Sequence, residues 1–437
     1  MESNFDGLSP KENINLPKTQ WRSSYNPVAL TTLEKITSEK IRSTRLEATD
    51  DDILKEVKPK QEKLGRYLDA IDKEVADNFE VFESQEHPGV RFSHSLVDVN
   101  KVAGLVHSRS SNQEQEKGPR SKLTYVIFTG YQPLPGGDPD DEIHAVYDRV
   151  LTVLPEIKTR PDQDIELHVL GLPTSRWGSV TEEWIKGLEK GALEKHSDPK
   201  EYKKSEYGFS QHGSLYAEFL KTVLNKNQDP QSKERVMFYG SSMGAVLASE
   251  TAKKLPEIWN RLRVLVDVPT GAHQPTGKTI KLPFVGEMPF SGKGIQATTL
   301  FPVEALIRMA FDPLVKQSLG GKNAARQAFV DLQKERGMIP HDSDQENKLK
   351  KNANWQQIKL LIRGTPFDTD SFRSYVVQGM RDPATMGLKQ VLSFDEKGKK
   401  FFKAGNRSLG MGINYTHWMD RGRWLGKWIR NIEQYEK

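Results

Sequence analysis

Short, uninterrupted apolar segments recur along the chain, and stretches with helical spacing of apolar residues separate them. Five segments carry this pattern: Leu123–Phe128, Ile165–Leu170, Val236–Tyr239, Leu262–Val268 and Ser374–Gln378. Strands without polar alternation are typical of parallel sheets that are buried on both faces. Alternation with helices indicates βαβ units joined by right-handed crossovers. The predicted fold class is therefore α/β, with a mostly parallel central sheet and helices on both of its faces.

The N-terminal part of the chain follows a different pattern. Residues 1 to about 30 are polar and contain three prolines, which indicates a loose lead-in. From Leu33 to Val75 the apolar residues follow at steps of three and four, which predicts two or three helices. We interpret residues 1–77 as a helical and partly disordered extension that packs against a main domain over residues 78–437.

Two regions of the main domain depart from the strand and helix alternation. Three segments after Asn78 are predicted as further strands: Phe79–Glu83, Val90–Val97 and Lys101–His107. From about 270 to 354 no core strand is evident; prolines and glycines come first and a helical pattern follows. So long a stretch between two sheet strands predicts an inserted cap or lid. Residues 355–363 then predict a helix that returns to the sheet.

One motif carries the candidate chemistry. Gly240-x-Ser242-x-Gly244 follows a predicted buried strand and precedes an apolar, alanine-bearing helix. A nucleophilic serine needs a tight strand-to-helix turn that projects its hydroxyl above the sheet, and small neighbours where strand and helix approach each other. The helix N-terminus also directs its dipole and free N–H groups at the reacting centre. The flanking strand and helix therefore favour Ser242 as a nucleophile.

From about Phe79 to Lys437 the chain resembles the α/β-hydrolase family, in which the nucleophile, the acid and the histidine follow in that order. In the acid position the resemblance implies Asp382, which follows the strand-like run from Ser374 to Gln378. Asp267, at the end of an earlier predicted strand, is the alternative acid. In the base position it implies His417, which follows Asp382 and precedes a helix-like C-terminus.

The resemblance also implies an oxyanion hole made of two backbone N–H groups. One belongs to Met243, the residue after the nucleophile. The other belongs to Tyr131, because Phe128 to Pro133 resembles the family's His-Gly-x-Pro loop. The chain has Thr129 where a histidine is common, but a main-chain donor does not depend on that side chain.

These residues predict a serine hydrolase that cleaves a carboxylic ester or related acyl bond of a small molecule through an acyl-enzyme. The expected chemistry needs no cofactor. An acyltransferase, a thioesterase or a peptidase would use the same three residues, so these alternatives stay open. A non-catalytic member of the fold that acts as a binding or scaffold module is the alternative from another class.

The composition of the chain limits the binding partners and the cellular location that we expect. The chain has 437 residues with 64 basic and 59 acidic side chains interspersed, which argues against a nucleic-acid-binding face. It has no cysteine, and its histidines show no metal-ligand spacing, so neither disulfides nor a metal site is expected. No apolar run reaches the roughly 20 residues of a transmembrane helix, and the N-terminus has no signal-peptide pattern. We expect a cytoplasmic protein; no pattern indicates an oligomeric state.

Overall fold

The structure is a computed structural model. It describes residues 21–107, 121–130, 139–193, 206–224, 234–267, 272–273, 279–282, 286–289, 313–363, 365–366, 371–379, 392–394, 400–403, 408–413 and 421–437. The described helices are α1 (Tyr25–Thr44), α2 (Asp50–Asp77), α3 (Val99–His107), α4 (Pro139–Thr159), α5 (Glu182–Leu193), α7 (Phe209–Leu224), α8 (Met243–Lys253), the 3-10 helix η3 (Pro256–Ile258), α10 (Pro313–Glu335), α11 (Asp344–Arg363) and α12 (Arg421–Glu436).

The described strands of the main sheet are β1 (Phe79–Glu83), β2 (Arg91–Asp98), β3 (Ser121–Phe128), β4 (Gln163–Leu170), β5 (Arg235–Ser241), β6 (Leu262–Asp267), β11 (Ser374–Gly379), β12 (Leu392–Phe394), β13 (Lys400–Lys403) and β14 (Ser408–Ile413). Two short two-stranded sheets are made of β7 (Ala272–His273) with β10 (Thr365–Pro366), and of β8 (Thr279–Leu282) with β9 (Gly286–Pro289).

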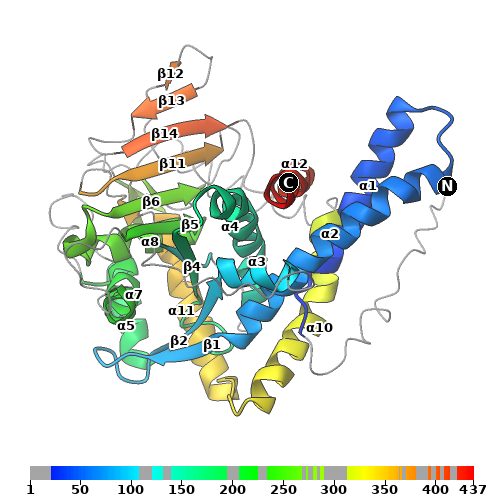
Figure 1. The fold of residues 1–437 in the computed structure, drawn as a ribbon. Helices are drawn as coiled ribbons and strands as arrows, with labels where there is room; N and C mark the ends of the chain where they lie inside the picture. The colour runs from blue at the N-terminus through cyan, green and yellow to red at the C-terminus, as the bar shows by residue number, and fades with distance from the viewer. Residues whose placement is uncertain are drawn as a thin grey trace.

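The main sheet has the order β1-β2-β4-β3-β5-β6-β11-β14-β13-β12. Its centre, from β4 to β14, is parallel throughout. Antiparallel pairs flank this centre, with β1 and β2 at one edge and β12 and β13 at the other. Helices cover both faces, so the predicted α/β class with a mostly parallel sheet is confirmed (Figure 1).

Successive residues of the central strands enter two different cores. On β3, Val126 and Phe128 pack with α5, α7 and α8 on one face of the sheet. Tyr125 and Ile127 pack with α2, α4 and α12 on the other. Because side chains alternate along a strand and both sets are apolar, β3 is apolar from Tyr125 to Phe128. This double burial is the physical basis of the uninterrupted runs in the sequence.

The predicted strands of the main sheet are found close to their predicted bounds, with one exception. Residues Lys101–His107 were expected in a strand, and this prediction is wrong, because Val99–His107 form α3. The apolar residues Val99, Val102, Ala103 and Val106 recur at helical intervals and lie on one face of α3. The first three of them are buried in the core that α2 and α4 share.

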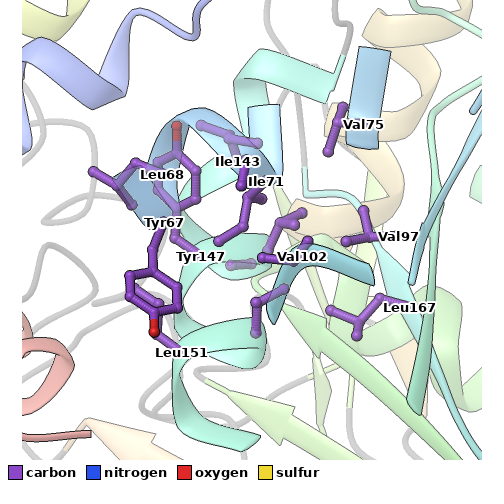
Figure 2. Close-up of a cluster of buried hydrophobic side chains, with 14 of the residues drawn as sticks. Tyr67, Leu68, Ile71, Val75, Val97, Val102, Ile143, Tyr147, Leu151 and Leu167 are labelled. Atoms are coloured by element: carbon purple, nitrogen blue, oxygen red, sulfur yellow. The ribbon is translucent and has the colours of Figure 1, made fainter. Parts of the chain in front are cut away.

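The helices α1 and α2 share that core with the sheet. Figure 2 shows Leu68 and Ile71 of α2 beside Ile143 of α4, and Leu167 of β4 belongs to the same core. Thr49 caps α2 with a full capping box, because its side chain accepts from the Asp52 N–H and the Asp52 side chain accepts from the Thr49 N–H. The division between residues 77 and 78 stays a prediction.

The segment just before α1 is not a loose lead-in, so the prediction for residues 1 to about 30 is wrong where the structure describes them. Ser23 donates its N–H to Asp72 Oδ2 (3.0 Å) and bonds Tyr147 Oη through its hydroxyl (2.5 Å). Ser24 donates its N–H and its hydroxyl to the two carboxylate oxygens of Asp140, each at 2.7 Å. Both serines are buried. These bonds fasten the start of α1 to α2 and α4.

The predicted insertion contains β7, β8, β9, α10 and the start of α11 among its described residues. On α10, Phe329 is fully buried against Trp21 and Phe79. On α11, Gln357 is buried and contacts His212 of α7. The helix predicted over residues 355–363 lies inside α11, which begins earlier, at Asp344. A lid role for this stretch stays a prediction.

Candidate functional site

Ser242 lies at the turn between β5 and α8 in a backbone conformation that side-chain-bearing residues rarely adopt. Its φ is 56° and its ψ is −126°. Among the described residues it is the one non-glycine residue with positive φ. Such a conformation costs roughly 1–3 kcal/mol and persists where the surrounding structure enforces it. Ser242 is also partly exposed, although the residues around it are largely buried. The turn therefore presents this hydroxyl at the end of β5.

Two glycines enforce this turn, which we call the elbow (Gly240–Gly244). A Cβ atom on Gly240 would lie 2.1 Å from the carbonyl oxygen of Gly244. A Cβ atom on Gly244 would lie 2.2 Å from the carbonyl oxygen of Phe128, at the end of β3. Both contacts are with backbone, which cannot move aside as a side chain can. The predicted need for small residues two positions either side of Ser242 is confirmed.

The helix that follows the elbow starts directly at the serine. Ser242 is the N-cap of α8, and Met243, the first helical residue, is fully buried. The first N–H groups of a helix have no acceptor within the helix, and the helix dipole makes this end positive. The N–H group of Met243 therefore belongs to an end of α8 that favours negative charge next to Ser242.

The end of β3 forms a second wall beside Ser242. Thr129 is buried, and its N–H donates to the carbonyl oxygen of Leu170 (3.3 Å). A Cβ atom on Gly130 would lie 3.8 Å from Ser242 Cβ, in ordinary contact. Gly130 donates its N–H to Glu142 Oε1 on α4 at 2.8 Å. Burial raises the pKa of Glu142 to about 7, and the Gly130 hydrogen bond opposes that rise. A carboxyl group thus lies next to the strand end that contacts the serine.

The remaining predicted site residues are described in part or not at all. Asp382, His417 and Tyr131 lie outside the described residues. The backbone of Asp267 ends β6 and pairs with Ser241 of the neighbouring strand. The structure thus brings Ser242, Met243 and the Asp267 backbone to one edge of the sheet.

Glu142 is the residue near the serine that the sequence did not single out. It follows the predicted oxyanion loop and lies in the first turn of α4. A glutamate there is common in helices, because the helix dipole favours acidic residues in the first turn. Glu142 is twelve residues from Gly130 in the chain, so their contact is not visible as a local sequence pattern.

Two buried histidines outside the elbow have acidic partners that their spacing did not reveal. His94 Nδ1 is 2.7 Å from Glu80 Oε1, and His94 Nε2 is 3.0 Å from His168 Nδ1. His168 Nε2 is 3.6 Å from Glu166 Oε2. These residues join β1, β2 and β4 by hydrogen bonds. Within the described part of the chain, no group of three or more potential ligands is arranged to hold a metal ion.

No protein-family model matches the chain, and no curated protein matches it. Solved structures with a similar arrangement include a peroxisomal α/β-hydrolase of Saccharomyces cerevisiae, with 9% identity, 82% of this chain and 88% of that chain covered, and a TM-score of 0.37. The mouse α/β hydrolase domain-containing protein 10 has 10% identity, coverages of 81% and 96%, and a TM-score of 0.30. A thermophilic esterase from Thermogutta terrifontis has 11% identity, coverages of 78% and 94%, and a TM-score of 0.30.

No described helix combines the length and the apolar character that crossing a membrane requires.

The identities and TM-scores of these solved structures are too low to assign the fold, which follows instead from the sheet and the elbow of this chain. The parallel centre of the sheet is covered by helices on both faces, and the strained serine follows a central strand and caps the next helix. The chain has the α/β-hydrolase fold.

Proposed function

We propose that the protein is a serine hydrolase that cleaves a carboxylic ester or related acyl bond, with Ser242 as the nucleophile. The observation that carries this proposal is the positive φ of Ser242 at the turn between β5 and α8. A serine that only caps a helix has no need of this conformation, because ordinary N-caps have extended backbone angles. The strain is accounted for by a hydroxyl that must project from the sheet toward a substrate.

In the proposed reaction, Ser242 Oγ attacks the acyl carbon while His417 accepts the hydroxyl proton. The N–H groups of Met243 and Tyr131 stabilise the oxyanion that forms. His417 then returns the proton to the leaving group, and the acyl group stays on Ser242. Water, deprotonated by His417, attacks the acyl-enzyme and releases the acid. Asp382 would accept a hydrogen bond from His417 Nδ1 and stabilise the imidazolium.

The order of the strands supports these partners. The parallel strands β5, β6, β11 and β14 have their carboxyl ends at the same edge of the sheet. Asp382 follows the end of β11 by three residues, and His417 follows the end of β14 by four. The strand ends that precede Asp382 and His417 therefore lie at the edge of the sheet where Ser242 lies, which supports the proposal. Asp267 ends β6, the immediate neighbour of β5, and stays the alternative acid.

The substrate is proposed to be a small molecule with an acyl or ester group, which the stretch from about 270 to 354 would cover as a lid. A lid excludes water and favours an apolar acyl group. Acyl transfer, thioester hydrolysis and peptide hydrolysis would proceed through the same acyl-enzyme, and the acceptor or leaving group distinguishes them. A cytoplasmic location is proposed with the same function.

The test of the nucleophile is covalent labelling with a fluorophosphonate probe, which reacts with activated serines. We expect the wild-type protein to be labelled and the Ser242→Ala variant to remain unlabelled. Ser241→Ala is the matched control, because Ser241 is the preceding residue and ends β5. Labelling that persists in Ser242→Ala, or no labelling of the wild-type protein, would contradict the proposal.

The acid is tested by hydrolysis of short-chain p-nitrophenyl esters. We expect Asp382→Asn to lower kcat by about 10⁴-fold, because the amide supports the wrong imidazole tautomer. Asp267→Asn should change kcat by less than about tenfold if it only ends β6. The opposite ranking of the two variants would assign the acid to Asp267.

A further inference from the structure

We propose that Glu142 is a positioning residue of this site, whose carboxyl group holds the end of β3 against Ser242 by accepting a hydrogen bond from Gly130. The inference rests on the proposed function, because it assigns Glu142 a role in presenting the same serine. Glu142 acts through Gly130 and would not itself react. Among the described residues, the N–H group of Gly130 is the hydrogen-bond partner of this carboxyl group.

The contact geometry places Gly130 between the carboxyl group and the serine. A methyl-sized group on Gly130 would lie 3.2 Å from Glu142 Oε1 and 3.8 Å from Ser242 Cβ, so it would touch both. The same group would lie 3.5 Å from the carbonyl oxygen of Ser241. Gly130 is therefore packed against the elbow. Loss of the hydrogen bond to Glu142 would allow Gly130 to shift and would change the packing beside Ser242.

The helix that carries Glu142 is fixed at its beginning. Two residues before Glu142, Asp140 accepts two hydrogen bonds from Ser24, each 2.7 Å long. One residue after Glu142, Ile143 is fully buried in the core between α2 and the sheet. The carboxyl group thus projects from a helical turn that is held on both sides. A hydrogen bond to a carboxyl group fixed in this way keeps Gly130 in one position, as a positioning role requires.

The bond also determines what Gly130 can do. Because its N–H group is committed to Glu142, the Gly130 amide is not a donor for the oxyanion, and the hydrogen bond fixes the orientation of the Thr129–Gly130 peptide. An acceptor at Glu142 is sufficient for this effect, and a negative charge is not required. Since burial raises the pKa of Glu142 to about 7, the neutral form is well populated at neutral pH, and a glutamine resembles it closely.

Two substitutions separate the acceptor from the size of the side chain. Glu142→Gln keeps both, whereas Glu142→Met keeps the size and loses the acceptor. Glu142→Asp keeps the charge and withdraws the carboxyl group from Gly130 by one methylene. Glu156→Met is the matched control, because Glu156 is an exposed residue near the other end of α4.

The experiment measures the rate of fluorophosphonate labelling at Ser242, kcat and KM for a p-nitrophenyl ester, and the urea midpoint of each variant. We expect Glu142→Gln and Glu156→Met to stay within about threefold of wild type. We expect Glu142→Met and Glu142→Asp to lose about 10- to 100-fold in labelling rate and in kcat with little change in KM, because small misplacements of a reacting group have effects of this size. If Glu142→Met does not fold, the labelling rate and kcat of Glu142→Asp test the inference.

Two outcomes would overturn the inference. One is labelling of Glu142→Met or Glu142→Asp at the wild-type rate. The other is a loss in Glu142→Gln as large as in Glu142→Asp, which would mean that charge and not the acceptor matters. Both leave the wild-type protein labelled at Ser242. Absence of wild-type labelling is a different result, because it removes the proposed function and the role of Glu142 with it.

Discussion

The carboxyl group of Asp72 should make the stability of the fold depend on pH, and Asp72→Asn should remove this dependence. Asp72 is buried on α2, and its hydrogen-bond partners in the described part of the chain are uncharged. Oδ1 accepts from Tyr147 (2.5 Å), and Oδ2 accepts from the Ser23 N–H (3.0 Å) and from Asn26 Nδ2 (3.3 Å). An asparagine in this place can accept the last two bonds and donate to Tyr147 Oη.

The magnitude follows from the ionisation of this group. Burial raises the pKa of Asp72 from 3.8 to about 7, although hydrogen bonds from Tyr147, Ser23 and Asn26 oppose the rise. A pKa that is higher in the folded state favours folding at low pH, and this contribution is lost as pH rises from the unfolded pKa through the folded one. At 1.36 kcal/mol for each pKa unit, the loss reaches about 4 kcal/mol above pH 7.

Urea unfolding of the wild-type protein and of Asp72→Asn at pH 4.5, 6 and 8 measures this loss. We expect the variant to be more stable than wild type by about 1 kcal/mol or less at pH 4.5 and by about 4 kcal/mol at pH 8. Asp69→Asn is the control, because Asp69 lies on the same helix, is half exposed and pairs with Arg22. Its effect should be below about 1 kcal/mol. A difference between wild type and Asp72→Asn that is equal at pH 4.5 and pH 8 would refute the reasoning.

Three further predictions concern the elbow and the two cores. Gly244→Ala would place a Cβ 2.2 Å from the Phe128 carbonyl oxygen and should slow fluorophosphonate labelling about 100-fold. Gly426→Ala is the control and should leave the labelling rate unchanged, because the nearest atom to its new Cβ is the flexible end of Arg430, at 3.6 Å. Equal labelling rates for the two variants would contradict the packing argument. Trp428→Ala should lower the free energy of unfolding by about 3–5 kcal/mol in urea, because Trp428 is fully buried. Burial lowers the pKa of His212 to about 4, so neutral His212 should contribute about 3 kcal/mol to the free energy of unfolding, a contribution that is lost as pH falls from 6.5 to 4. His212→Gln should lose less over the same range.

The centre of the sheet could be predicted because strands such as β3 are buried on both faces. Val126 and Ile127 are neighbours in β3 and enter opposite cores, so both are apolar and the run is visible in the sequence. The prediction for α3 was wrong because the segment is short and its β-branched valines favour a strand, whereas burial against α2 and α4 favours the helix. The buried start of α1 was missed, since Ser23 and Ser24 are polar and become buried only through partners on α2 and α4.

Part of the candidate site could be predicted from the sequence, and part could not. The strain at Ser242 could be anticipated, because the two glycines and the flanking strand and helix are local in the chain. Glu142 could not be, because its role depends on a contact with Gly130 across a loop, and a first-turn glutamate has a simpler explanation. The assignments of Asp382 and His417 stay predictions that depend on the family resemblance.

The apolar side of α2 has a practical consequence for shortened versions of the protein. Leu64, Leu68, Ile71 and Val75 are each fully buried in the core next to the sheet. A chain trimmed to start at Phe79 would uncover the matching surface of α4 and β4 to water. Proteins that expose a large apolar surface tend to aggregate. A shortened version of the protein should therefore keep the residues from Trp21 onward.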